Sequence, residues 1–111
     1  MNPKYCLVLS TCPLGEPAES LARFLVEEHL AACVNILPGL ASIYPWQGKL
    51  ETSAEALLLI KTERALYQVL ETALRERHPY DLPEIVVIDI AQGLPDYLHW
   101  ISQWLFTDTH S

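Results

Sequence analysis

The sequence predicts an α+β domain built on a single β-sheet that is apolar on both faces. Successive side chains of a strand point to opposite faces of the sheet. Ala56, Leu58 and Ile60 therefore face one way. Leu57 and Leu59 face the other way. A chain of 111 residues is too short to cover both faces with helices, so we expect another copy of the chain to cover one of them. Further short apolar runs that predict strands occupy residues 5–9 and 85–88.

The composition indicates one acidic globular domain over residues 1–111. Half of the residues are hydrophobic and the formal net charge is −7. An acidic chain without a basic stripe is a poor partner for nucleic acid or an anionic membrane, so neither is expected. The apolar run after Lys4 is too short for a signal peptide. Three cysteines, an odd number without close pairing, favour a reducing compartment, and we expect a cytoplasmic protein.

The first half of the chain predicts a strand, a helix and a long β-hairpin. Pro17 can open the helix, and Gln47-Gly48 supplies the hairpin turn. Pro38 interrupts the first hairpin strand. Because proline cannot donate a ladder hydrogen bond, that strand is expected at a sheet edge or with a bulge. The expected elements are a strand over residues 5–11, a helix over 17–30 and strands over 33–46 and 49–62.

The second half predicts a helix, a strand and a final helix. Thr62 is expected to cap the first of these helices and Pro79 to end it. A strand over residues 84–91 follows, and a last helix begins after Pro95. The order β-α-β-β-α-β is the ferredoxin-like arrangement, in which both crossover helices cover one sheet face. The bare second face predicts a closed oligomer. Apolar residues at helical spacing in the second helix are Leu66, Val69, Leu70, Ala73 and Leu74.

Six segments of the chain stand out: LAACVNI (residues 30–36), SIYPWQGKL (42–50), Glu55, IKT (60–62), HPYDLPEI (78–85), and Tyr97, Leu98, Trp100 and Ile101. In this order they resemble the CutA divalent-cation tolerance family over nearly the whole chain. The resemblance implies a trimer of ferredoxin-like subunits with a PII-like architecture, in which the long hairpin reaches neighbouring subunits. It also implies tolerance to copper and other divalent cations, with metal binding. Asp81 stands where the family often has a glutamate. The aspartate keeps the negative charge, but its side chain is shorter.

Cys33, His78 and Glu84 are the candidate metal ligands. Thiolates and imidazoles suit copper and zinc, but no short spacing of ligands marks a site, so ligands from different subunits are expected. The alternative for Cys33 is a small buried side chain, which we also expect for Cys6. The alternative for His78 is a cap at the end of the second helix. Cys12 precedes a proline in a loop and is expected to be the most accessible thiol.

A second group of residues predicts a cleft at the boundary between subunits. A small effector could bind there, as in a PII-like signalling module, which is the alternative to a metal-response protein. Alternatively, the two hairpin aromatic residues pack within the trimer, and Lys61 or Glu55 forms an ion pair with a neighbour. The cleft residues are Tyr44, Trp46, Glu55, Lys61, Tyr80 and Glu84.

An enzymatic role has little support in the sequence. Glu84, His78 and Lys61 could serve as acid and base groups, but no nucleophile is evidently paired with a base. The isolated glycines form no phosphate-binding motif. We therefore expect a protein that is not an enzyme, with itself and divalent metal ions as its partners.

Overall fold

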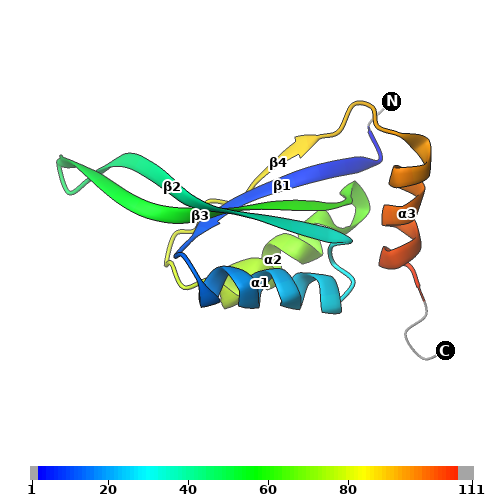
Figure 1. Cartoon of the computed structure of the whole chain (residues 1–111), viewed down its shortest axis with the longest axis horizontal. Coiled ribbons are helices and arrows are strands. Elements are labelled where there is room, and N and C mark those ends of the chain that lie inside the picture. Colours follow the sequence, from blue (N-terminus) through cyan, green and yellow to red (C-terminus); the bar gives the residue numbers. More distant parts are fainter. Residues whose placement is uncertain (1–2, 108–111) are drawn as a thin grey trace.

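The computed structural model, which describes residues 3–107, has the ferredoxin-like arrangement that the sequence predicts (Figure 1). Four strands form one antiparallel sheet in the order β2-β3-β1-β4. No helix of these residues is long and apolar enough to cross a membrane. The strands are β1 (Tyr5–Cys12), β2 (Cys33–Trp46), β3 (Lys49–Glu63) and β4 (Val86–Asp89). The helices are α1 (Glu16–Glu27), the short 3₁₀ turn η1 (Arg64–Leu66), α2 (Tyr67–Arg77) and α3 (Pro95–Leu105).

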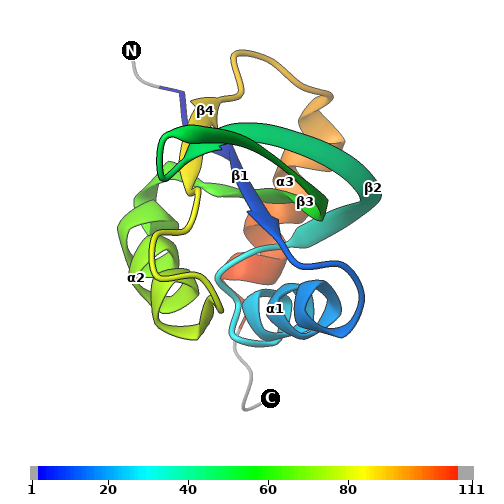
Figure 2. The same cartoon turned by 90° about the vertical axis from the view of Figure 1, so that its left-hand side faces the viewer.

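Helices α1 and α2 lie side by side on one face of the sheet, as Figures 1 and 2 show. The side chains that β1 and β3 direct toward them alternate with outward ones, and the inward ones are fully buried. Burying each large aliphatic side chain contributes about 1.5–3 kcal/mol, so this layer stabilises the subunit. Its largest fully buried apolar members are Val8, Leu25, Leu58, Ile60, Leu70 and Leu74.

The β2–β3 hairpin extends well beyond the rest of the sheet (Figure 1). Gln47 and Gly48 both have positive φ values, 50° and 80°, which suits the two central residues of a tight hairpin turn. The prediction for Pro38 is confirmed, because β2 is an edge strand and its register shifts between Leu37 and Leu40. The hairpin gives the subunit its length of 49 Å against 32 and 22 Å in the other directions.

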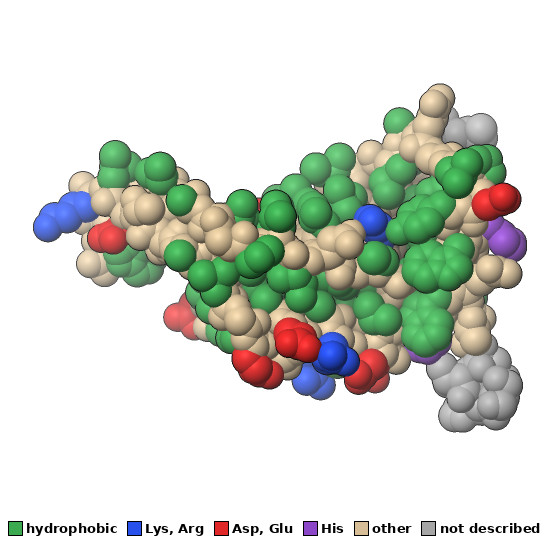
Figure 3. All heavy atoms as spheres, viewed as in Figure 1, with side chains coloured by type: hydrophobic (Ala, Val, Ile, Leu, Met, Phe, Trp, Pro, Cys, Tyr) green, Lys and Arg blue, Asp and Glu red, His purple; other side chains and the backbone are tan. Residues whose placement is uncertain are grey.

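The sheet face opposite α1 and α2, called the open face below, carries a field of apolar side chains. Leu9 pairs with Leu59 on one side and with Val86 on the other, and Leu7 pairs with Ile88. Val86 and Ile88 are 46% and 50% exposed. Figure 3 shows hydrophobic side chains on this side of the sheet, whereas charged side chains gather over the helix layer. The prediction that both faces are apolar is confirmed.

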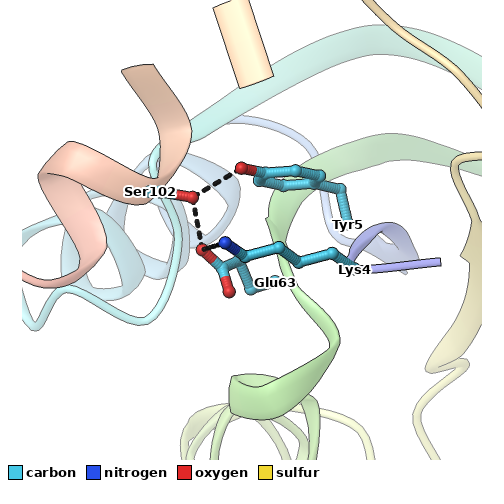
Figure 4. A network of polar contacts seen from close by, with 4 residues as sticks. All are labelled: Lys4, Tyr5, Glu63 and Ser102. Atoms are coloured by element: carbon cyan, nitrogen blue, oxygen red, sulfur yellow. Dashed lines mark hydrogen bonds and ion pairs between the residues drawn. The ribbon is translucent and has the colours of Figure 1, made fainter. Parts of the chain in front are cut away.

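Helix α3 covers one end of the open face, so this face is not bare throughout, which differs from the prediction. Tyr5 and Glu63 form a cross-strand pair at this end, and Ser102 of α3 links them (Figure 4). The Ser102 hydroxyl donates to a Glu63 carboxylate oxygen and lies 2.6 Å from the Tyr5 hydroxyl. Lys4 Nζ lies 4.0 Å from the same carboxylate oxygen. Alongside this network, α3 buries Ile101 and Leu105.

Several local predictions were wrong. Thr62 does not cap α2, because it is buried in β3 and donates to the Leu30 carbonyl at 2.7 Å. Val69 is 56% exposed, since it points away from the side of α2 that buries Leu70 and Leu74. The last strand is shorter than predicted, since the pairing of β4 with β1 spans four residues. Helix α1 ends at Glu27, before the predicted end at residue 30.

Candidate functional sites

Apart from Glu84, the predicted site residues lie in three separate places in the chain. One group surrounds His78 where α2 ends, a second surrounds Lys61 beside α3, and the third is at the tip of the hairpin. In each place, the existing hydrogen bonds determine which side-chain atoms are free to bind a ligand.

His78 lies at the end of α2 as a buried, hydrogen-bonded imidazole. The residue is only 8% exposed. Nδ1 accepts a hydrogen bond from the Tyr80 backbone N–H at 3.1 Å, so Nε2 carries the proton and donates to the Thr11 carbonyl at 2.9 Å. Burial lowers the pKa of His78, against smaller opposite effects of the Thr11 hydrogen bond and of Glu55. The ring is therefore held in its neutral form and joins α2 to β1.

Tyr80 and Glu55 are joined beside this histidine. The Tyr80 hydroxyl donates to Glu55 Oε2 at 2.7 Å, and Glu55 is only 7% exposed. Burial is the largest cause of a strongly raised pKa for Tyr80, and the hydrogen bond to Glu55 adds to it. The pKa of the nearby Cys12 thiol is also raised, by burial first and then by the Glu55 charge. This is a connected polar cluster inside one subunit, and the prediction that Cys12 is the most accessible thiol is wrong, because Cys12 is fully buried.

Lys61 lies near the other end of β3. Its ammonium donates to the Tyr97 hydroxyl of α3 at 3.3 Å and lies 5.5 Å from the centre of that ring. Tyr97 in turn stacks on Trp100, with ring centres 5.6 Å apart. Cys33 is the cross-strand partner of Lys61, and its thiol points toward Asn35 Oδ1 at 3.9 Å. Sequence reasoning did not assign Tyr97 to the cleft, although the aromatic spacing of residues 97, 100 and 104 marks one side of a helix.

Tyr44 and Trp46 lie near the tip of the hairpin. Trp46 is 59% exposed, and the Tyr44 hydroxyl lies 2.7 Å from Ser53 Oγ across the hairpin. Trp46 pairs with Lys49, which is twelve residues along β3 from Lys61. At about 3.3 Å per residue this separates the tip from Lys61 by roughly 40 Å. One chain therefore does not assemble the predicted cleft.

The three predicted metal ligands are also apart in one subunit. Cys33 pairs with Lys61, whereas Thr11, to which His78 binds, pairs with Leu57. Lys61 and Leu57, which mark the positions of Cys33 and His78 along β3, are four residues apart, which is roughly 13 Å. Glu84 is exposed in the segment before β4. Within residues 3–107, no three His, Cys, Asp or Glu side chains come together as a metal site, so the predicted ligands do not form one within this part of a single chain.

The family of the chain follows from comparison with known proteins. Residues 6–104 match the model of the CutA1 divalent ion tolerance protein family. The chain belongs to the CutA1 family. A CutA1-family relative, the divalent-cation tolerance protein CutA of Thermus thermophilus, is 48% identical over 97 residues, which are 87% of this chain and 94% of that protein. The predicted resemblance is confirmed.

Other CutA1 relatives differ in length and agree in fold. The mouse protein CutA is 45% identical over 93 residues, which cover 84% of this chain, but the chain spans only about half (52%) of the mouse protein. The crystal structure of CutA from Xylella fastidiosa is 47% identical and superimposes with a TM-score of 0.90, covering 92% of this chain and 98% of that one. The CutA1 fold is therefore shared closely by this chain.

Proposed function

We propose that this chain functions as a homotrimeric divalent-cation tolerance protein that binds metal ions without catalysing a reaction. The main support for an assembly is the open face, where Leu7, Leu9, Leu57 and Leu59 form an apolar surface. Among the described residues, no helix packs on this surface except α3 at one end. A soluble protein rarely leaves such a field in water, and a symmetric assembly removes it. The exposed tip of the hairpin supplies a second surface for neighbouring copies.

Copper is the metal we propose, with Cys33, His78 and Glu84 as ligands from more than one subunit. Thiolate favours copper(I), and Cys33 is the only one of the three cysteines that is not buried. Since His78 Nδ1 accepts the Tyr80 amide, a metal on this nitrogen would have to displace that hydrogen bond. Metal binding at His78 is therefore expected to loosen residues 79–85.

The metal proposal is tested by titrating the purified, reduced protein with copper(I) under a competing chelator and, separately, with magnesium. Copper uptake without magnesium uptake is expected. The double variant Cys33→Ser, His78→Ala should weaken copper uptake at least tenfold, whereas His99→Ala, on the exposed side of α3, should leave it unchanged. The solution mass of each variant shows whether assembly persists. An unchanged copper titration in the assembled double variant would exclude Cys33 and His78 as ligands.

A PII-like module that binds a small effector between subunits is the second candidate, and it is favoured by Lys61 with Tyr97. This pair offers two polar groups beside an aromatic surface at the edge of the open face. Tyr44, Trp46, Glu55, Tyr80 and Glu84 of neighbouring copies would complete the cleft. A thermal-shift screen of metabolites and nucleotides should then give hits that quench tryptophan fluorescence and depend on Lys61. Copper uptake should be insensitive to Lys61, which separates the two candidates.

The remaining parts of the proposal concern location and excluded roles. Three unpaired cysteines suit a reducing compartment, and we infer a cytoplasmic protein. The net charge of −7 disfavours nucleic acid and anionic membranes as partners. Because both ring nitrogens of His78 are engaged in hydrogen bonds, this residue is not arranged as a general base, which supports a role other than catalysis.

A further inference from the structure

Lys61 places a positive charge beside apolar side chains of the open face. Its neighbour on β1 is Leu7, and the next residue across, on β4, is Ile88. Along β3, Leu59 precedes it on the same face. Lys61 is half-buried already in the single subunit. If another copy covers this face, the ammonium loses most of its remaining water, and a buried charge is tolerated only with a partner of opposite charge.

No carboxylate within residues 3–107 serves as that partner. The ion pairs of these residues join Lys4 to Glu63, Arg23 to Glu19 and Arg64 to Asp89, and Lys61 takes part in none of them. Glu63 is two residues from Lys61 on the same strand face, but it accepts the Ser102 hydroxyl and lies beside Lys4. The negative charge nearest along the strand is therefore already committed to other groups.

Lys61 and Tyr97 together present two hydrogen-bond donors. The Tyr97 hydroxyl accepts from the Lys61 ammonium at 3.3 Å, so its own hydrogen is free to point elsewhere. The ammonium has three N–H donors, of which Tyr97 takes one. An oxygen placed beside both groups would accept one hydrogen bond from each. Because both groups donate hydrogen bonds and no carboxylate of the described residues is bonded to them, they suit an oxyanion better than a cation.

We propose that Lys61 and Tyr97 bind an oxyanion, a carboxylate or phosphate group, at the boundary between subunits. The proposal rests on the assembly put forward under Proposed function and specifies the chemistry of that boundary. The group comes either from a small free anion or from a carboxylate side chain of a neighbouring copy. In both cases the anion offsets the charge that the assembly removes from water, and assembly is thereby coupled to the anion.

The experiment compares wild type with Lys61→Met and with Arg75→Met, which removes the same charge from the exposed side of α2, away from the open face and the hairpin. The dissociation of each assembly is measured by sedimentation over a dilution series. Each series is run in sodium chloride and in inorganic phosphate at equal ionic strength. If the anion is free, phosphate should tighten the assembly of wild type and Arg75→Met at least threefold and leave Lys61→Met unchanged. Tyr97→Phe should reduce the phosphate effect.

If the anion is a neighbour's carboxylate, Lys61→Met should weaken the assembly at least tenfold in both salts, and phosphate should have no effect on wild type. Glu84→Gln, before β4, and Glu51→Gln, on β3 near the hairpin tip, each remove an exposed carboxylate and then identify the partner. The proposal is overturned if Lys61→Met assembles as tightly as wild type, or more tightly, and phosphate acts no differently from chloride. A methionine would stabilise the assembly if the ammonium had no partner there. A monomeric wild type would instead overturn the assembly itself, so the two failures are distinct.

Discussion

The Tyr80 hydroxyl donates to Glu55 Oε2 at 2.7 Å, which ties the segment after α2 to the middle of β3. The two residues are 25 positions apart in the sequence, and Tyr80 lies where the chain turns from α2 toward β4. His78 adds a second attachment, since its ring joins Tyr80 N–H to the Thr11 carbonyl. Two side chains of the HPYDLPEI segment thus fix its start to β1 and β3.

Replacing Tyr80 by phenylalanine should lower the free energy of unfolding by about 1–3 kcal/mol. The substitution leaves the buried Glu55 carboxylate without this donor, and an unsatisfied buried acceptor costs about that much. Urea denaturation measures the change, with Tyr44→Phe as a control because that hydroxyl lies on the exposed hairpin. In a double-mutant cycle, Tyr80→Phe should cost little once Glu55 is leucine. Equal costs in both backgrounds would contradict a direct coupling.

Acidification should weaken the subunit through His78. Burial holds the pKa of His78 below its ordinary value of 6.5, so the unfolded chain takes up a proton on this residue at a higher pH than the folded chain. Its contribution to stability is therefore fully present above pH 6.5 and is lost as the pH falls from there toward the lowered folded pKa. Urea unfolding from about pH 7.5 to 5 should show this loss in wild type and a flatter dependence in His78→Gln. His99→Gln should follow wild type, and parallel curves for all three proteins would refute the prediction.

Two of the three cysteines should resist thiol reagents in the folded protein. Burial is the main cause that raises the pKa of Cys6 to about 11 and also raises the pKa of Cys12, and both residues are fully buried. Since the thiolate is the reactive form, the Cys33→Ser variant should show almost no reaction until denaturant is added. Two equivalents should then react. Rapid labelling of the native variant would mean that β1 opens readily.

Removing the Ser102 hydroxyl should detach the end of α3 from the sheet. Ser102→Ala leaves the buried Glu63 carboxylate without its Ser102 donor and the Tyr5 hydroxyl without its Ser102 contact, with an expected cost of about 1–3 kcal/mol. Amide hydrogen exchange should rise in α3 more than in α1 or α2. Gln103→Ala, the exposed neighbouring position, is the matched control. Uniform exchange rates in wild type and Ser102→Ala would show that the apolar contacts of Ile101 and Leu105 hold α3 alone.

The sequence predicted the fold well where a local pattern determines the structure. Alternation in β3 separates Leu58 and Ile60 from Leu57 and Leu59, and the structure buries the first pair more deeply. Pro38 predicted an edge or a bulge because proline lacks a ladder donor, and both are present. In these cases a property of one residue or of one spacing is enough.

Predictions failed where the outcome depends on contacts between distant segments. Pro13 suggested a loop around Cys12, yet β1 continues to Cys12 because it pairs with Ala56 of β3. Thr62 has the chemistry of a helix cap, but β3 continues past it and its hydroxyl binds Leu30. The Glu55–Tyr80 pair leaves no local signal. The cleft could not be assembled from the sequence either, since four of its residues are spread along the hairpin and the other two, Tyr80 and Glu84, follow α2.

The proposed assembly is tested most simply by the solution mass of the wild-type protein at micromolar concentration. The apolar open face and the long hairpin lead us to predict three times the 12.6 kDa mass of one chain, by light scattering or sedimentation. Leu59→Glu, which places a charge in the middle of the open face, should shift the mass toward that of one chain. A stable wild-type species of 12.6 kDa would contradict the assembly, together with the sites that it locates between subunits.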